Sequence, residues 1–245
     1  MNFTFRWYES LIKLLSEQGY HFADYHNWKQ IKNPVILRHD IDYDMLKALE
    51  IAKLEASKEV TSTYFVLVTS DFYNIFSMKN SKLIHQIQDY GHEIGLHFDE
   101  MRYPRAVGDI NKIKQKIIKE ANILSYITEC PVTTVSMHRP SKTVLNADLK
   151  LPDIINSYSQ VFFHEFKYLS DSRRHWREPV EDIISDKKFE RLHILTHAFW
   201  YYKEEKSMHD TIEEFINSAN GRYYDSFHEN FTDLESVMKA EEILV

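Results

Sequence analysis

Two aspartates, Asp40 and Asp42, stand two residues apart at the end of an apolar segment that begins at Val35. Alternate side chains of a β-strand point to the same face, so a strand here would direct both carboxylates to one side, about 6–7 Å apart along the chain. Two such carboxylates repel each other unless a cation or a shared proton lies between them. The pair therefore points to metal binding or acid–base chemistry.

Further polar side chains close other apolar segments of the same kind. They are His97, His138, Arg139 and His197. In folds built from parallel strands, the chemistry gathers beyond the carboxyl ends of the strands. We therefore expect these residues and the two aspartates to converge at one end of a sheet.

The polar neighbours of these residues are interpreted as structural. Arg38 shares the face of the two carboxylates but lies deeper, which favours a buried ion pair, whereas His39 alternates to the opposite face and should pack behind the strand. The alternation likewise assigns His92 to a packing or orienting role. Glu93 and His193 share faces with His97 and His197 but lie deeper in their strands, so both are interpreted as structural.

Strand-like and helix-like segments alternate along the chain. β-branched and aromatic runs predict strands, and apolar residues at helical spacing predict helices. The strands are expected at 35–41, 61–69, 92–97, 132–137, near 161–168 and at 192–196, and the helices at 8–18, after Met45, at 81–90, at about 107–126 and at about 209–240. Repeated β-then-α units imply parallel strands with helices outside, as a barrel or as an open doubly wound sheet.

Length and composition fit one globular enzyme-sized domain. Without a linker, a repeat or a charge block, residues 1–245 are expected to form a single domain with a catalytic core of about 33–202 and helical extensions at 8–18 and about 209–240. The net charge of −7 argues against nucleic acid or an anionic membrane as partner. A lone cysteine, Cys130, excludes an internal disulfide and a Cys-rich zinc site.

The N-terminal residues lack the basic and apolar regions of a signal peptide, and no run of about 18 apolar residues could span a membrane. A cytoplasmic protein without a transmembrane segment is therefore expected. The oligomeric state is left open.

In their order along the chain, these segments resemble the five motifs of the polysaccharide deacetylases of the NodB-homology type, which form carbohydrate esterase family 4. The segments similar to the successive motifs are Arg38-His39-Asp40-Ile41-Asp42, Gly91-His92-Glu93-Ile94-Gly95-Leu96-His97, His138-Arg139-Pro140, Asp171-Ser172-Arg173-Arg174-His175-Trp176 and Leu195-Thr196-His197. The second is the most specific, and together they span residues 38 to 200.

The resemblance implies a distorted (β/α) barrel with six to seven parallel strands and one divalent metal, usually zinc. Carried over residue by residue, it assigns Asp40 as catalytic base, Asp42 and His97 as metal ligands, Arg139 as the arginine that orients the base, Trp176 as an aromatic residue of the substrate groove and His197 as general acid.

One position departs from the family pattern. The second metal-binding histidine is expected four residues after His97, where this chain has Met101, and a thioether is a poor zinc ligand among oxygen and nitrogen donors. His138 or Asp99 could supply the third ligand, or fewer protein groups could hold the metal, or no metal binds. We assign the third ligand to His138.

Ser141 and Trp200 complete the expected site. The backbone N–H of Ser141 could stabilise an oxyanion, and Trp176 and Trp200 could stack on a sugar ring, although core packing would explain the two tryptophans equally well.

The expected function is removal of an N-acetyl or similar group from an amino sugar. A cytoplasmic location favours a nucleotide-linked or lipid-linked precursor of a surface polysaccharide such as an O-antigen. Two alternatives stay open: a non-catalytic sugar-binding relative with the same fold, and a metal-free C–N hydrolase.

Overall fold

The computed structural model describes residues 2–243, and the chain divides into two compact units, Met1–Lys203 and Glu204–Val245. The first unit contains the sheet and ends next to residue 202, where the catalytic core was expected to end. The assignment of residues 1–245 to a single domain stays a prediction.

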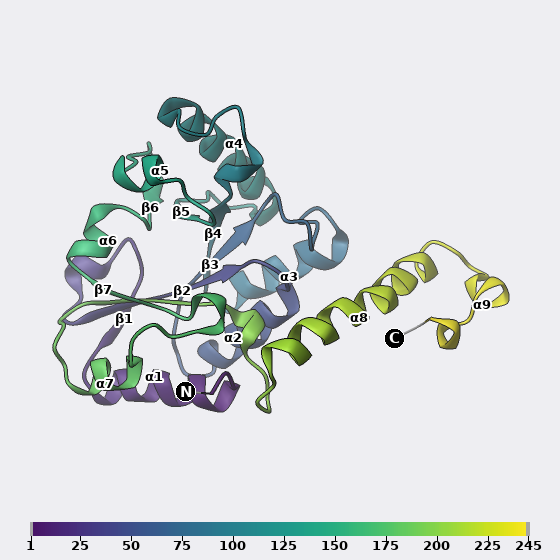
Figure 1. Cartoon of the computed structure of the whole chain (residues 1–245), viewed down its shortest axis with the longest axis horizontal. Helices are drawn as coiled ribbons and strands as arrows, with labels where there is room; N and C mark the ends of the chain where they lie inside the picture. Colours follow the sequence, from purple (N-terminus) through teal and green to yellow (C-terminus); the bar gives the residue numbers. More distant parts are fainter. Residues whose placement is uncertain (1, 244–245) are drawn as a thin grey trace. The chain divides into compact units, whose positions relative to one another are not determined.

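A parallel sheet forms the centre of the first unit (Figure 1). Its strands are β1 (His21–Ala23), β2 (Pro34–Ile41), β3 (Thr63–Leu67), β4 (Glu93–Phe98), β5 (Thr134–Met137), β6 (Ile155–Asn156), β7 (Lys167–Ser170) and β8 (Leu192–Thr196). Every residue of β2 is buried, as expected for a parallel strand that is covered on both faces.

The order of the strands is that of an interrupted barrel. Strands β2 to β6 are successive neighbours, and β8 and β7 follow on the other side of β2, so that consecutive strands adjoin everywhere except between β6 and β7. Among the described residues no ladder joins these two edges. This distorted (β/α) barrel of seven parallel strands confirms the predicted fold class, and the three-residue β1 pairs with the first half of β2 as an eighth strand.

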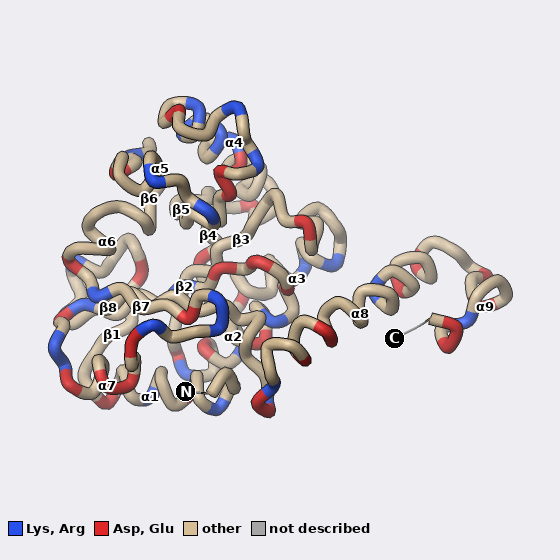
Figure 2. Tube along the Cα trace, in the orientation of Figure 1, with Lys and Arg blue, Asp and Glu red and all other residues tan. Residues whose placement is uncertain are grey.

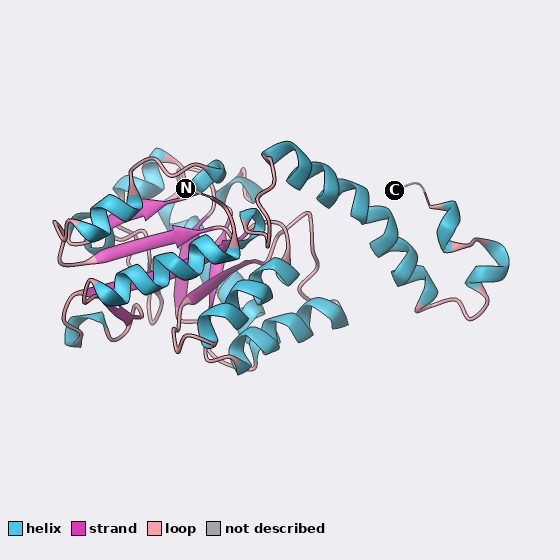
Figure 3. Cartoon of the chain, turned by 90° about the horizontal axis from the view of Figure 1, so that it is seen from below, coloured by secondary structure: helices cyan, strands magenta, loops and turns pink. Residues whose placement is uncertain are grey.

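Helices lie outside the sheet (Figure 3). They are α1 (Phe5–Glu17), α2 (Met45–Ala56), α3 (Met78–Asp89), α4 (Ile110–Thr128), α5 (Lys142–Asn146), α6 (Gln160–His164) and α7 (Val180–Ser185). The helices predicted at 8–18, 81–90 and about 107–126 correspond to α1, α3 and α4. Gly19, with φ of 71°, follows α1 in a left-handed conformation that glycine adopts at little cost.

The strand predicted near 161–168 is wrong in its first half. Residues 160–164 form the short helix α6, and the strand β7 begins only at Lys167. The run Val161-Phe162-Phe163 is typical of a strand, but Phe162 is fixed by tertiary packing, with its ring edge-on to Tyr25 at 4.9 Å. Packing therefore overrides local preference here.

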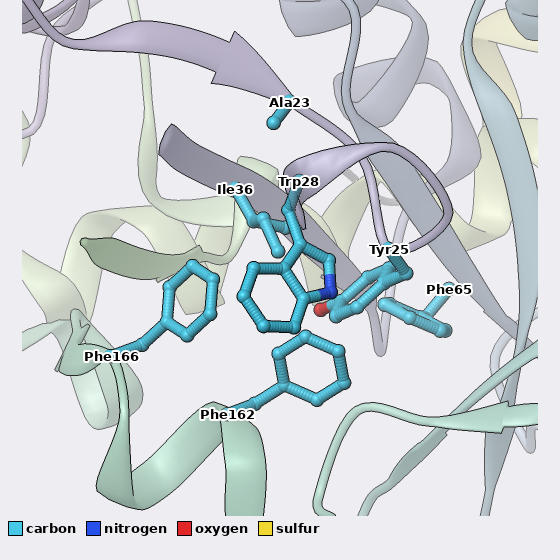
Figure 4. Close-up of a cluster of buried hydrophobic side chains, with 7 residues drawn as sticks. All are labelled: Ala23, Tyr25, Trp28, Ile36, Phe65, Phe162 and Phe166. Atoms are coloured by element: carbon cyan, nitrogen blue, oxygen red, sulfur yellow. The ribbon is translucent and has the colours of Figure 1, made fainter. Parts of the chain in front are cut away.

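That contact belongs to an aromatic cluster that links β1, β2, β3 and α6 (Figure 4). Its members are Ala23, Tyr25, Trp28, Ile36, Phe65, Phe162 and Phe166. Close by on β4, a Cβ atom at Gly95 would lie 2.5 Å from both the Phe65 ring and the Thr134 hydroxyl, so only glycine fits there.

The second unit is helical and contains α8 (Met208–His228), α9 (Leu234–Val237) and a short 3₁₀ turn at Ala240–Glu242. The single helix predicted for about 209–240 is therefore wrong beyond His228. Residues 229–233 include Asn230, Thr232 and Asp233, whose side chains favour turns and helix ends over helix interiors. In the described part of the chain, no helix has the length and apolar character needed to cross a membrane.

Candidate active site

Side chains from three strand ends meet at one point. Asp42 follows β2, His97 lies near the end of β4, and His138 follows β5. Oδ1 of Asp42 is 3.2 Å from Nε2 of His97 and 3.2 Å from Nδ1 of His138, and these two nitrogens are 3.1 Å apart. The structure thus brings together the three residues predicted as metal ligands.

The three donor atoms fit a divalent metal. Ligands bound tetrahedrally to zinc at ordinary bond lengths lie about 3.3 Å from one another, close to the separations seen here. Oδ1 of Asp42 is buried and accepts no hydrogen bond of good geometry from any described residue, which is expected of an oxygen that serves as a metal ligand. Nδ1 of His97 lies 3.1 Å from Oγ of Ser136, a contact that orients the ring and leaves Nε2 to coordinate.

Neither Met101, at the position of the expected histidine, nor Asp99, the alternative third ligand, joins the three candidate metal ligands. The side chain of Met101 is 53% exposed. Asp99 is buried, but its Oδ1 accepts the backbone N–H of Met101 at 3.1 Å, so that it caps the turn after β4. The donor set is therefore one carboxylate and two imidazoles.

Asp40 lies directly beside this group, 3.7 Å from Nε2 of His97. The buried guanidinium of Arg38 donates to Asp40 at 2.8 Å, and Oγ of Ser136 lies 3.3 Å away. Burial raises the pKa of the Asp40 carboxyl, but Arg38, with smaller contributions from His97 and His197, outweighs this effect, and the pKa falls below its usual value. Asp40 is thus ionised at neutral pH and can accept a proton. The predicted buried ion pair of Arg38 is confirmed.

Arg139, predicted to orient Asp40, lies elsewhere. It forms an ion pair with Asp99 through two hydrogen bonds, in which Nε donates to Oδ1 at 3.2 Å and Nη2 donates to Oδ2. The Arg139 side chain is 56% exposed. His138 precedes it and turns into the site, which directs Arg139 to the other side. The place beside Asp40 belongs to Arg38, which also donates to Ser157 at 2.8 Å.

His197 is held by a residue to which the sequence assigned no role. Nδ1 of His197 lies 2.7 Å from Oδ1 of the buried Asp171, and the backbone N–H of His197 also donates to this carboxylate. The Tyr201 hydroxyl donates to the other oxygen at 3.0 Å. Asp171 stood in the segment resembling the fourth motif, and its position directly after a strand was the signal that could have identified it.

The environment of His197 keeps its imidazole charged. Burial lowers its pKa, but the charge of Asp171 and the hydrogen bond to it outweigh this effect, and the pKa rises to about 9. Nε2, the other ring nitrogen, lies 3.8 Å from Oδ2 of Asp42. A protonated imidazole therefore lies next to the candidate metal ligand Asp42.

The three residues predicted to contact substrate have partners within the fold. Trp176 is buried with its ring 5.8 Å from that of Trp7, and Trp200 is buried with its ring 4.8 Å from that of Phe199. The backbone N–H of Ser141 donates to Oε2 of Glu100 at 2.7 Å. That N–H is therefore already paired, and the packing of both tryptophans agrees with the core interpretation.

The residues interpreted as structural are confirmed in that role. His39 is fully buried and contacts Glu55 at 2.9 Å behind β2. His92 lies 2.9 Å from a carbonyl oxygen of α2, and His193 lies 2.7 Å from the Tyr25 hydroxyl. None of these side chains belongs to the group of candidate metal ligands.

Comparison with known proteins gives matches only among solved structures, since no family model and no curated protein matches the chain. A family 4 acetyl xylan esterase from Clostridium thermocellum, in complex with a cobalt ion, is 15% identical with a TM-score of 0.42, over 77% of this chain and 84% of that one. A family 4 carbohydrate esterase from Bacillus anthracis is 17% identical with a TM-score of 0.42, over 89% and 85%. A CE4 family pseudoenzyme from Bacillus anthracis is 14% identical with a TM-score of 0.43, over 78% and 62%.

Proposed function

We propose that this protein is a metal-dependent hydrolase that removes an N-acetyl or similar acyl group from an amino sugar, as a divergent relative of the polysaccharide deacetylases. The observation that carries the proposal is the meeting of Asp42, His97 and His138 next to an ionised carboxylate, Asp40, and a charged imidazole, His197. Binding of a sugar alone would require neither a base nor an acid.

Asp42, His97 and His138 would hold the metal, which when bound supplies Lewis acidity that polarises the carbonyl of the scissile amide. Two imidazoles and one carboxylate suit zinc, and the ion is proposed to be zinc, although the same donors also accept other divalent transition metals.

Asp40 is the proposed general base and takes a proton from the attacking water. Arg38 keeps this carboxylate ionised and fixes its position through the contact at 2.8 Å. Removing the proton as the water attacks the amide carbon avoids a cationic oxygen in the transition state.

His197 is the proposed general acid and gives its Nε2 proton to the departing amine. Asp171 accepts the Nδ1–H bond at 2.7 Å, which fixes the ring so that Nε2 faces the site. An amine leaves far more readily than an amide anion, so cleavage of the C–N bond depends on this proton.

The substrate is proposed to be a nucleotide-linked or lipid-linked acetamido sugar that serves as a precursor of a surface polysaccharide such as an O-antigen, handled in the cytoplasm. This part of the proposal rests on the sequence alone. A purified protein that deacetylates polymers but none of these precursors would contradict it.

Metal content and an Asp40 variant test the main proposal. We expect close to one zinc per chain in purified protein, acetate release from acetamido sugars, and loss of that activity in Asp40→Asn with zinc retained. Sugar binding without bound zinc and without acetate release would favour the non-catalytic alternative, which the replacement of the expected histidine by Met101 supports. Acetate release that persists after complete zinc removal would favour the metal-free hydrolase.

A further inference from the structure

An exposed apolar stripe runs along α8. The exposed fractions of its members range from 40% to 69%. These members are Met208, Ile212, Ile216, Tyr223 and Phe227. At about 100° per residue their spacing places all five within an arc about 100° wide, with Ala219 inside the same arc. A helix of 21 residues that presents such a stripe calls for a partner surface.

The charges of α8 lie away from the stripe. Asp210, Glu214 and Asp225 fall on the opposite side of the helix, and Glu213 and Arg222 border the stripe on its two edges. Acidic residues also predominate in the rest of the unit, as Figure 2 shows. An anionic membrane surface would therefore repel this segment, whereas two copies of the stripe could meet with their acidic faces turned outward.

The area of the stripe is sufficient for a pair. If a fully exposed large apolar side chain presents about 200 Å², the five residues offer roughly 500 Å² per copy. Two copies in contact would bury about 1,000 Å², which is the lower limit for a specific interface. A two-fold contact needs only one surface, because each copy presents the same stripe to the other.

We propose that α8 is a dimerisation element, in which the stripe packs antiparallel against that of a second copy of the chain. Ile212 and Ile216 occupy the first half of the stripe, and Tyr223 and Phe227 occupy the second half. Antiparallel packing lays the aliphatic half of each copy on the aromatic half of the other. Ala219, near the midpoint, has a small side chain that lets the helices approach at the two-fold axis.

The mass of the full-length protein in solution tests this inference independently of any activity. We expect light scattering to give twice 29.3 kDa for the wild type and 29.3 kDa for Ile216→Glu. Asn217→Glu adds the same charge on the opposite face of the helix and should stay dimeric. Thermal unfolding should show that both variants remain folded. A monomeric wild type, or a dimeric Ile216→Glu, would overturn the proposal.

Cysteine cross-linking tests the orientation. In a Cys130→Ser background, Ala219→Cys should form a covalent dimer on oxidation, because both copies of residue 219 lie at the axis. Ile212→Cys should not, since antiparallel packing separates its two copies by about 21 Å along the helix. Asn217→Cys, on the far face, serves as the negative control. Absence of the Ala219→Cys dimer would refute the interface, and rapid cross-linking of Ile212→Cys would refute the antiparallel orientation.

Discussion

Two buried aspartates serve opposite purposes in the candidate site. Asp40 lies against Arg38, which favours the ionised carboxylate and makes it a proton acceptor. Asp171 lies against His197 and favours the charged imidazole, which makes that ring a proton donor. Each proposed catalytic group near Asp42 thus has a buried partner of opposite charge that favours its charged form.

Replacement of Asp171 should impair the acid specifically. In Asp171→Asn the pKa of His197 should fall from about 9, because the charge that raises it is gone. Protonated His197 is available below its pKa, so turnover should decline as pH rises through that value, and the decline should move to lower pH in the variant. We expect a loss of about 10²–10³-fold in kcat at neutral pH. The pH profile of kcat measures both effects, and an unchanged profile would contradict the assigned role.

The two arginines should differ in their contribution to stability. Arg38→Met leaves the Asp40 carboxylate buried without its partner, which should lower the free energy of unfolding by about 3–5 kcal/mol. Arg139→Met removes a half-exposed pair and should cost less, about 1 kcal/mol. Urea unfolding of the two variants provides the comparison. Equal losses would mean that Arg38 has no special role beneath the site.

At the scale of elements, a buried carboxylate on α2 joins the helices to the sheet behind the site. Glu55 accepts hydrogen bonds from Tyr8 on α1 at 2.5 Å, from Tyr64 on β3 at 2.7 Å and from Ser62 at 2.6 Å. His39 on β2 lies 2.9 Å from the same carboxylate. Because His39 directly precedes Asp40, this cluster fixes the strand that carries the proposed base.

Glu55→Gln should destabilise the fold by about 3 kcal/mol, because an amide group cannot accept the hydrogen bonds that both carboxylate oxygens accept. Burial raises the pKa of Glu55, but His39 and the other donors lower it to about 2. The stabilisation is therefore present above the unfolded-state pKa of about 4.3 and is lost as pH falls through about 2.

Urea unfolding at pH 7 and at pH 3 measures both parts of the Glu55 prediction. Ser62→Ala is the matched control, since it removes one donor and should cost only about 1 kcal/mol. A Glu55→Gln variant as stable as Ser62→Ala at pH 7 would show that the carboxylate is not the centre of the cluster.

At the scale of the whole first unit, the proposed metal would tie together the ends of β2, β4 and β5. Its removal should therefore affect global stability as well as activity. Such a ligand stabilises the folded state in proportion to the logarithm of its concentration relative to Kd, by about 2.7 kcal/mol at a hundredfold excess over Kd.

Zinc should accordingly raise the Tm of chelator-treated protein, and His138→Ala should abolish most of that rise. The matched control is His209→Ala, which alters the exposed group His209, Asp210 and Glu213, the other set of possible metal ligands among the described residues. Calorimetry with and without zinc measures the difference. A zinc response that survives in His138→Ala but is lost in His209→Ala would place the metal on α8 instead.

Much of the fold could be predicted because its signals are local. The strands at 35–41, 92–97, 132–137 and 192–196 are short segments with apolar or β-branched residues. The segments between them carry apolar residues at helical spacing, so parallel strands with external helices are the expected arrangement. The rule that parallel strands gather function at their carboxyl ends then predicted from the sequence that Asp40, Asp42, His97, His138 and His197 lie close together. Two-residue alternation also separated Arg38 and His39 to opposite faces.

The partners of these residues were decided only by the tertiary structure. Sequence alternation could not show that His138 would turn inward and direct Arg139 to Asp99, or that Asp171, beyond β7, would reach His197 after β8. Alternation gives the face of a side chain but not the neighbour across the sheet, which depends on strand order and register. That is the physical reason why the chain alone identified the groups at the site and the folded molecule identified which charge each one faces.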